Sequence, residues 1–228
     1  MALFAGHRNG LWTPERKRSL YLGILLIVIA VFVQVEVGHY SSARAAAATP
    51  ASDLFLDNLP VVNLDFLVVA GGIAMWVVAW LLIALLKPRH LLFGMKAIAL
   101  FIIVRAFFTS LTHIGAYPLG SAPGPDDFGF SLYHLLTFQG NFFFSGHTGF
   151  PFLMALIFWE DDLWRVFFLV MSAVFGITVL LAHVHYSIDV FAAPFIVYGV
   201  FRIAERVFTE DYELTAGGNM ATYGNLGK

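Results

Sequence analysis

Two short polar segments interrupt a largely apolar sequence, and both carry residues suited to phosphate chemistry. Residues 139–149 read Gln-Gly-Asn-Phe-Phe-Phe-Ser-Gly-His-Thr-Gly, and residues 182–190 read Ala-His-Val-His-Tyr-Ser-Ile-Asp-Val. In the first segment Ser145 is suited to be the N-cap of a following helix, which would place Gly146 and His147 in the first turn. Such a turn offers free N–H groups and the positive end of the helix dipole to an anionic phosphate. Gly146 lets the phosphoryl oxygens approach the backbone closely.

The second segment supplies a possible nucleophile. His185 and Asp189 are four residues apart, so on a helix they would share a face and form a hydrogen bond. The carboxylate would fix the imidazole tautomer and leave the other nitrogen free to attack phosphorus. We expect His185 to form a phosphohistidine, and His147 to protonate the leaving alkoxide and then deprotonate the acceptor. Arg105 is expected to hold the equatorial oxygens with its planar guanidinium.

Each feature alone has an ordinary structural explanation. The His185–Asp189 pair is more often a local hydrogen bond than a catalytic dyad, and Arg105 is equally suited to extend toward the membrane interface. The evidence is the joint position of these groups, because all of them fall beside the same predicted membrane face. Polar groups within membrane segments are costly and are commonly tied to function.

The composition favours a membrane protein. Of the 228 residues, 59% are hydrophobic and 12% are charged, and the mean hydropathy is +0.79. A soluble domain carries about 25% charged residues. The net charge of −2 does not suggest a nucleic-acid partner, and the absence of cysteine excludes disulfides, thiolate metal sites and a cysteine nucleophile.

The apolar runs predict an all-α polytopic protein with six transmembrane helices. Most runs approach the ~20 residues needed to cross a bilayer core, but the fourth is short by that measure. The predicted domains are a cytoplasmic N-terminal segment, a transmembrane catalytic domain and a flexible cytoplasmic tail, at 1–18, 19–206 and 207–228. The six predicted spans are 19–37, 61–86, 91–111, 147–159, 166–182 and 188–204.

Charge asymmetry predicts the orientation. If the spans alternate, the basic residues gather on one side, and the loops 38–60 and 112–146 on the other side hold one Arg and four Asp. The positive-inside rule then places both termini in the cytoplasm and the polar segments at the outer face. The first span has a second interpretation, because the basic residues before it and the alanines at 43–48 are also typical of a cleaved signal peptide. We favour a retained helix.

With these motifs in place, the chain resembles the type-2 phosphatidic acid phosphatase (PAP2) superfamily, and within it the sphingomyelin synthase branch. One motif of that branch, Cys-Gly-Asp followed by three residues and Ser-Gly-His-Thr, aligns without a gap on residues 139–148. Another, Ala-His-x-His-Tyr-Thr-x-Asp-Val, matches 182–190 with Ser187 in place of Thr. An acidic Asp-x-Phe-x-Asp motif resembles 53–57, and an Arg motif is matched more loosely by Arg105 and Thr112.

The resemblance covers residues 50–205 and implies a six-helix PAP2-like bundle, an outward-facing site, no metal and no cofactor. It also implies that His185, His147 and Asp189 are catalytic. Gln139 and Asn141 stand where the branch has Cys and Asp, and Phe108 stands where it has Thr, so the choice of headgroup does not carry over. We expect the phosphate-binding residues to be Arg105, Ser145, Gly146 and Asn141.

The predicted function is a lipid phosphotransferase that moves a phospho-headgroup between lipids, so the expected partners are a phospholipid, a lipid alcohol and the bilayer. Hydrolysis of a lipid phosphate by the same residues is the alternative. A non-catalytic lipid-binding protein and a transporter are the other classes considered. His113 and His134 are weaker candidates for the entrance of the site.

Overall fold

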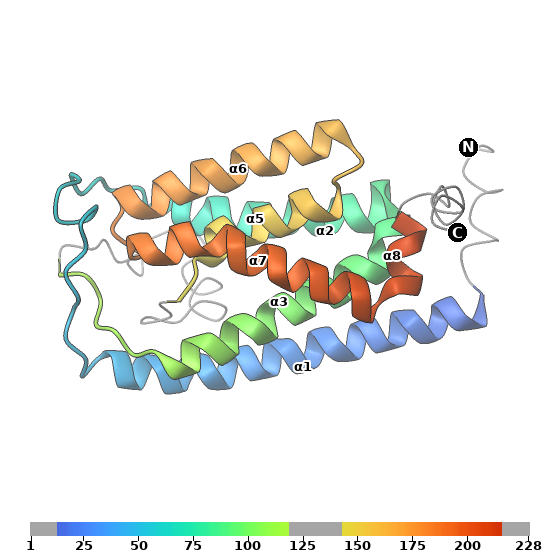
Figure 1. Ribbon diagram of the computed structural model, residues 1–228, viewed down its shortest axis with the longest axis horizontal. Coiled ribbons are helices and arrows are strands. Elements are labelled where there is room, and N and C mark those ends of the chain that lie inside the picture. The colour runs from blue at the N-terminus through green and yellow to red at the C-terminus, as the bar shows by residue number, and fades with distance from the viewer. Residues whose placement is uncertain (1–12, 119–142, 216–228) are drawn as a thin grey trace, which may run out of the picture.

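The computed structural model describes residues 13–118 and 143–215, and within them every regular element is a helix. Six helical segments run alternately back and forth along one bundle (Figure 1). We call the end where the first segment begins the termini end, and the opposite end the loop end. The segments are α1 (Pro14–Ala45), α2 (Gly72–Leu81) with flanking π-helical turns, α3 (Leu91–Leu111), α5 (Gly146–Ile157), α6 (Asp162–Leu181) and α7 (Ser187–Val207).

Five of these segments are long and apolar enough to cross a membrane, which confirms the predicted all-α polytopic fold. The second span includes the π-helical turns η2 (Leu67–Gly71) and η3 (Leu82–Leu86), and the third begins with the 3-10 turn η4 (Pro88–His90). The sixth segment, α5, has 12 residues and therefore a length of about 18 Å. It is shorter than a hydrocarbon core of about 30 Å.

The short helix α5 is enclosed by its neighbours. It packs against α6 and α7, and most of its residues are buried, among them Phe150, Leu153 and Met154. Backbone groups at the ends of a lipid-exposed helix this short would lie in hydrocarbon without partners, whereas protein surroundings satisfy them. The position of α5 inside the bundle therefore makes its short length tolerable.

The predicted boundaries of the first two spans are wrong by several residues. α1 begins at Pro14, where the Thr13 hydroxyl accepts a hydrogen bond from the Arg16 N–H at 3.4 Å, and it continues past residue 37 to Ala45. Residues 61–64, expected to be helical, are not, and the Val62 N–H donates to the Leu181 carbonyl at 2.8 Å. The Val62 backbone is thus paired with the last residue of α6.

Part of the predicted flexible tail is folded. Residues Thr209–Thr215 form helix α8 at the termini end, where Asp211 forms a buried ion pair with Lys96 of α3. Ser19 of α1 completes the group, because its hydroxyl donates to Asp211 at 2.7 Å and accepts from Lys96 at 2.9 Å. The prediction of a loose tail from 207 is wrong for residues 209–215, because Asp211 pairs with the buried Lys96 and holds α8 against α3.

The Lys96–Asp211 pair yields a stability prediction. Lys96→Met should lower the free energy of unfolding by about 3–5 kcal/mol, because it leaves Asp211 as a buried, unpaired charge. The measurement is the melting temperature of the purified protein in detergent.

The control is Lys87→Met, which removes an ion pair with Asp161 that is partly exposed and should cost less than about 1 kcal/mol. The double variant Lys96→Met/Asp211→Leu should recover much of the loss. Equal effects of the two single variants would contradict the prediction.

Candidate active site

The first half of the site is the start of α5. Ser145 is the N-cap, and its hydroxyl accepts from the Thr148 N–H at 3.4 Å, as the sequence predicted. Its own N–H donates to the carbonyl of Asp189 at 2.8 Å, so the start of α5 is tied to the first turn of α7. Ser145 is fully buried and its hydroxyl serves the helix cap. Direct contact between Ser145 and phosphate stays a prediction.

The second half of the site is the start of α7. The His185 Nδ1 lies 3.2 Å from the Asp189 Oδ2, which also accepts the Tyr186 N–H at 3.2 Å. The predicted pair therefore forms, but not on one face of a helix, because His185 precedes α7 and Tyr186 is its N-cap. An ionised carboxylate only accepts hydrogen bonds, so Nδ1 carries the proton and Nε2 keeps a lone pair for attack.

The two histidines face each other across the site. The ring centroids of His147 and His185 are 6.3 Å apart, in an edge-to-face arrangement. Reacting atoms in a productive complex lie about 3–3.5 Å apart. The separation is thus wide enough for one phosphoryl group between the two rings.

A further contact fixes His147 and was not foreseen from the sequence. Its Nε2 lies 3.0 Å from the carbonyl oxygen of Val68 in the π-helical turn η2. A carbonyl only accepts, so the His147 Nε2 carries a hydrogen in this contact. A Cβ on Gly72 would lie 3.1 Å from the same Nε2, so this glycine permits the approach. The Gly71–Gly72 pair was the available signal.

Arg105 lies beside the start of α5. Its Nε donates to the carbonyl of Phe144 at 3.3 Å, and a Cβ on Gly146 would lie 3.5 Å from that Nε. Phe144 has a φ of 29°, a conformation that residues other than glycine rarely adopt. Such strained backbone is often found at functional sites. The positive charge of Arg105 and the N-terminus of α5 thus meet at one place.

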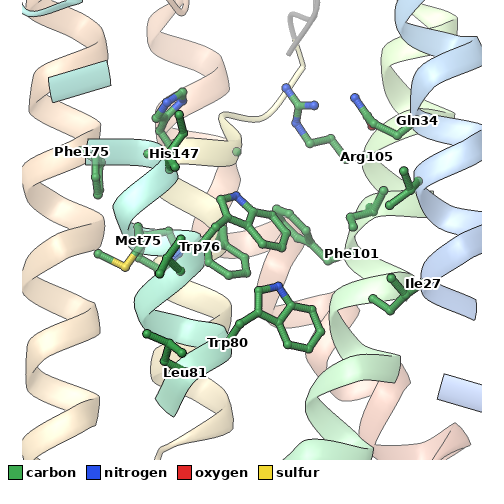
Figure 2. A pocket seen from close by; sticks show the side chains of 18 of the residues that line it. Ile27, Gln34, Met75, Trp76, Trp80, Leu81, Phe101, Arg105, His147 and Phe175 are labelled. Atoms are coloured by element: carbon green, nitrogen blue, oxygen red, sulfur yellow. The ribbon is translucent and has the colours of Figure 1, made fainter. Parts of the chain in front are cut away.

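An apolar cavity of about 560 Å³ extends from these groups between α1 and α2. In Figure 2, Arg105, Gln34 and His147 lie toward one end of it, and Trp80 and Leu81 toward the other. Gln34, Trp76 and Trp80 were not foreseen from the sequence as site residues. The signal for Gln34 was a polar side chain inside an apolar span, but an inward-facing tryptophan cannot be told from a lipid-facing one by composition.

The acidic segment 53–57 lies against the start of α7. Asp53 accepts hydrogen bonds from the Ser187 N–H at 2.7 Å and from the N–H groups of Phe55 and Leu56. Burial disfavours its charge, but these hydrogen bonds outweigh it and hold the pKa of Asp53 below its ordinary value. Asp57 accepts from the Tyr117 hydroxyl at 2.7 Å. In these contacts Asp53 anchors the loop next to His185.

The remaining candidates lie elsewhere. His113 packs edge-on against Tyr40, with 5.2 Å between the ring centroids, and is not among the residues that line the cavity. Phe108 stacks on Phe143 at 5.0 Å. His134 and Asn141 lie outside the described residues. The structure thus brings together His147, His185, Asp189, Arg105 and Gly146, and it leaves the role of Asn141 a prediction.

Comparison with known proteins points to the same part of the chain. A family model described as PAP2 superfamily C-terminal matches residues 140–206, a range that includes both histidines, Asp189 and helices α5 to α7. No curated protein and no solved structure matched the chain. The match supports the PAP2 superfamily, whose members are lipid phosphatases and phosphotransferases, and it does not single out a branch.

The anchoring role of Asp53 yields a pH-dependent prediction. Its folded pKa is below the unfolded value of about 3.8, so its contribution to stability is complete above that value and is lost as the pH falls through the folded pKa. At neutral pH, Asp53→Asn should lower the free energy of unfolding by about 1.5–3 kcal/mol, the worth of hydrogen bonds to a charged group.

The measurement is the melting temperature of wild type and variant in detergent between about pH 7 and about pH 3. The difference between them should shrink in the acidic part of this range. Asp162→Asn is the control, because this residue is exposed and makes a surface ion pair with Arg165, so it should have little effect. A difference for Asp53→Asn that does not change with pH would contradict the prediction.

Proposed function

We propose that this protein is an integral-membrane lipid phosphotransferase of the sphingomyelin-synthase-like type, which moves a phospho-headgroup between lipids through a phosphohistidine on His185. The observation that carries the proposal is the position of two histidines that face each other. Asp189 contacts the His185 ring, and the ring centroid of His185 lies 6.3 Å from that of His147. This pairing lies at the polar end of an apolar cavity. A soluble phosphate ester would not need such a cavity.

In the first half-reaction, the lone pair of the His185 Nε2 attacks phosphorus. The bond between phosphorus and the donor lipid oxygen breaks, and the His147 Nδ1–H gives its proton to the departing alkoxide, which leaves as a lipid alcohol. Arg105 and the N–H groups at the start of α5 stabilise the charge on the equatorial oxygens. Asp189 stabilises the positive charge on His185.

In the second half-reaction, the hydroxyl of the acceptor lipid gives its proton to the His147 Nδ1. Its oxygen attacks phosphorus, the bond between phosphorus and the His185 Nε2 breaks, and the headgroup leaves on the acceptor. The histidine pair returns to its starting protonation. The Nε2 of His147 stays bonded to the Val68 carbonyl throughout, so one nitrogen does both transfers.

Hydrolysis is the second candidate function. The PAP2 match favours it, because that superfamily includes lipid phosphatases. Water would then take the place of the acceptor hydroxyl in the second half-reaction, with the same residues in the same roles. The two functions differ in the acceptor, which a labelled substrate identifies directly.

The proposed orientation places the loop end at the outer face of the membrane and both termini in the cytoplasm. The termini end holds Lys87 and Arg89 at one turn, Arg165 at the next, and Arg202 and Arg206 near the end of α7. This asymmetry fits the positive-inside rule. It would give the active site access to lipids of the outer leaflet.

The nucleophile is tested by His185→Ala. This variant should lose lipid-modifying activity to background and should no longer take up label from a phospholipid carrying ³²P in its headgroup. His147→Ala should lower the rate by about 10²–10⁴-fold, the usual contribution of a general acid–base group.

Acid-labile, alkali-stable label on the protein is the signature of phosphohistidine and should be present in wild type. The control is His113→Ala, which alters a histidine near the loop end that does not line the cavity and should keep its activity. If all the lipid-modifying activity of the membranes survives His185→Ala, the catalytic role of His185 is overturned.

Transfer and hydrolysis are separated with purified protein in liposomes containing a labelled phospholipid. With ceramide or diacylglycerol present, we expect the label in a new lipid, and without acceptor the turnover should fall sharply. Free phosphate or free headgroup phosphate, formed at the same rate with and without acceptor, would overturn transfer and establish hydrolysis.

A further inference from the structure

The cavity that leads away from the two histidines has a polar end and a long apolar part. Arg105, Gln34 and His147 lie at the polar end, and Trp76 and Phe101 lie farther along (Figure 2). Beyond them are Trp80, Leu81 and Ile27 at the apolar end. This distribution of polar and apolar residues complements a phospholipid, which has an anionic group at one end of an apolar chain.

The cavity extends along α2. Its lining on α2 runs from Gly72 to Leu81, nine residues apart, which corresponds to about 14 Å along a helix. These residues occupy the middle of the span Leu67–Leu86. A chain bound with its phosphate beside Arg105 can therefore extend by about 14 Å along α2, toward the termini end of the bundle.

The walls of the cavity come from two helices on opposite sides. α1 packs mainly against α3, and α2 stands across the cavity from it (Figure 2). On the α2 side Trp76 stacks on Phe150, with ring centroids 3.8 Å apart and planes 12° apart, which packs this wall against α5. Trp80 lies one turn farther along α2 and is only partly buried.

Resting on the proposed function, we propose that this cavity binds the apolar chain of the lipid substrate, and that Trp80 and Ile27 set the chain length it accepts. The large indole of Trp80 and the side chain of Ile27 approach the apolar end from α2 and α1. Methylenes beyond them do not fit in the cavity and lose its packing contacts. Trp80 is thus a specificity-determining residue at the opposite end of the cavity from the reacting atoms.

The test is the chain-length dependence of turnover, measured in detergent micelles on phosphatidic acids and phosphatidylcholines from octanoyl through palmitoyl to longer acyl chains. Trp80→Ala should move the optimum to longer chains, and Ile27→Trp should move it to shorter ones. The readout is the position of the optimum, because a micellar substrate already has its chain in hydrocarbon and gains little from burial as such.

The control is Trp159→Ala, because Trp159 lies at the end of α5 and does not line the cavity, so its optimum should stay that of wild type. Trp80→Phe, a smaller change, should shift the optimum in the same direction as Trp80→Ala and guards against misfolding. An optimum that neither Trp80→Ala nor Ile27→Trp moves would overturn the inference.

Binding separates this inference from the proposed function. In the His185→Ala background, a phosphatidic acid brominated on its chain should quench tryptophan fluorescence saturably, and the unbrominated lipid should reverse the quenching. Trp80→Phe should reduce the saturable part. Saturable binding together with no turnover in wild type would sink the phosphotransferase while the chain site stands, whereas no saturable quenching would sink the chain site.

Discussion

The site depends on one set of buried hydrogen bonds between the starts of α5 and α7. The Ser145 N–H donates to the Asp189 carbonyl, and the Asp189 carboxylate binds both the His185 ring and the Tyr186 N–H. Asp189 thus contacts the first turn of its own helix, the His185 ring and the start of α5 at once. Asp189 and His185 are both buried, where an unsatisfied polar group is costly. The two motifs far apart in the sequence therefore fold as a single unit.

This junction also explains why α5 is short. In the proposed function, its N-terminus lies within the bundle, where its dipole can act on a phosphate beside Arg105. A helix of full span would carry its first turn out to the interface. The 12 residues of α5 begin at the site and end within the bundle, and the packing of α6 and α7 around them keeps their backbone away from lipid.

Much of the fold and of the site could be predicted from the sequence, and the reason is the same for both. Apolar length specifies membrane helices, and the Ser145–His147 segment matches a helix start by residue type alone. The His185–Asp189 contact was predicted for the wrong reason, because four-residue spacing fits a capping arrangement as well as a helical face. Local patterns did not reveal α8, since a buried charge at Lys96 finds its partner only in three dimensions.

In the proposed function, the second span contributes both to catalysis and to substrate binding. Its π-helical turn η2 supplies the Val68 carbonyl that binds His147, and the helix that follows presents Trp76 and Trp80 to the cavity. A π-helical turn leaves no plain mark in sequence and is common at functional sites. This segment carries both the carbonyl that contacts His147 and a wall of the cavity, so in the proposed function a lipid chain bound along α2 would influence the position of His147. Binding energy gained far from phosphorus can in this way be used at the reacting centre.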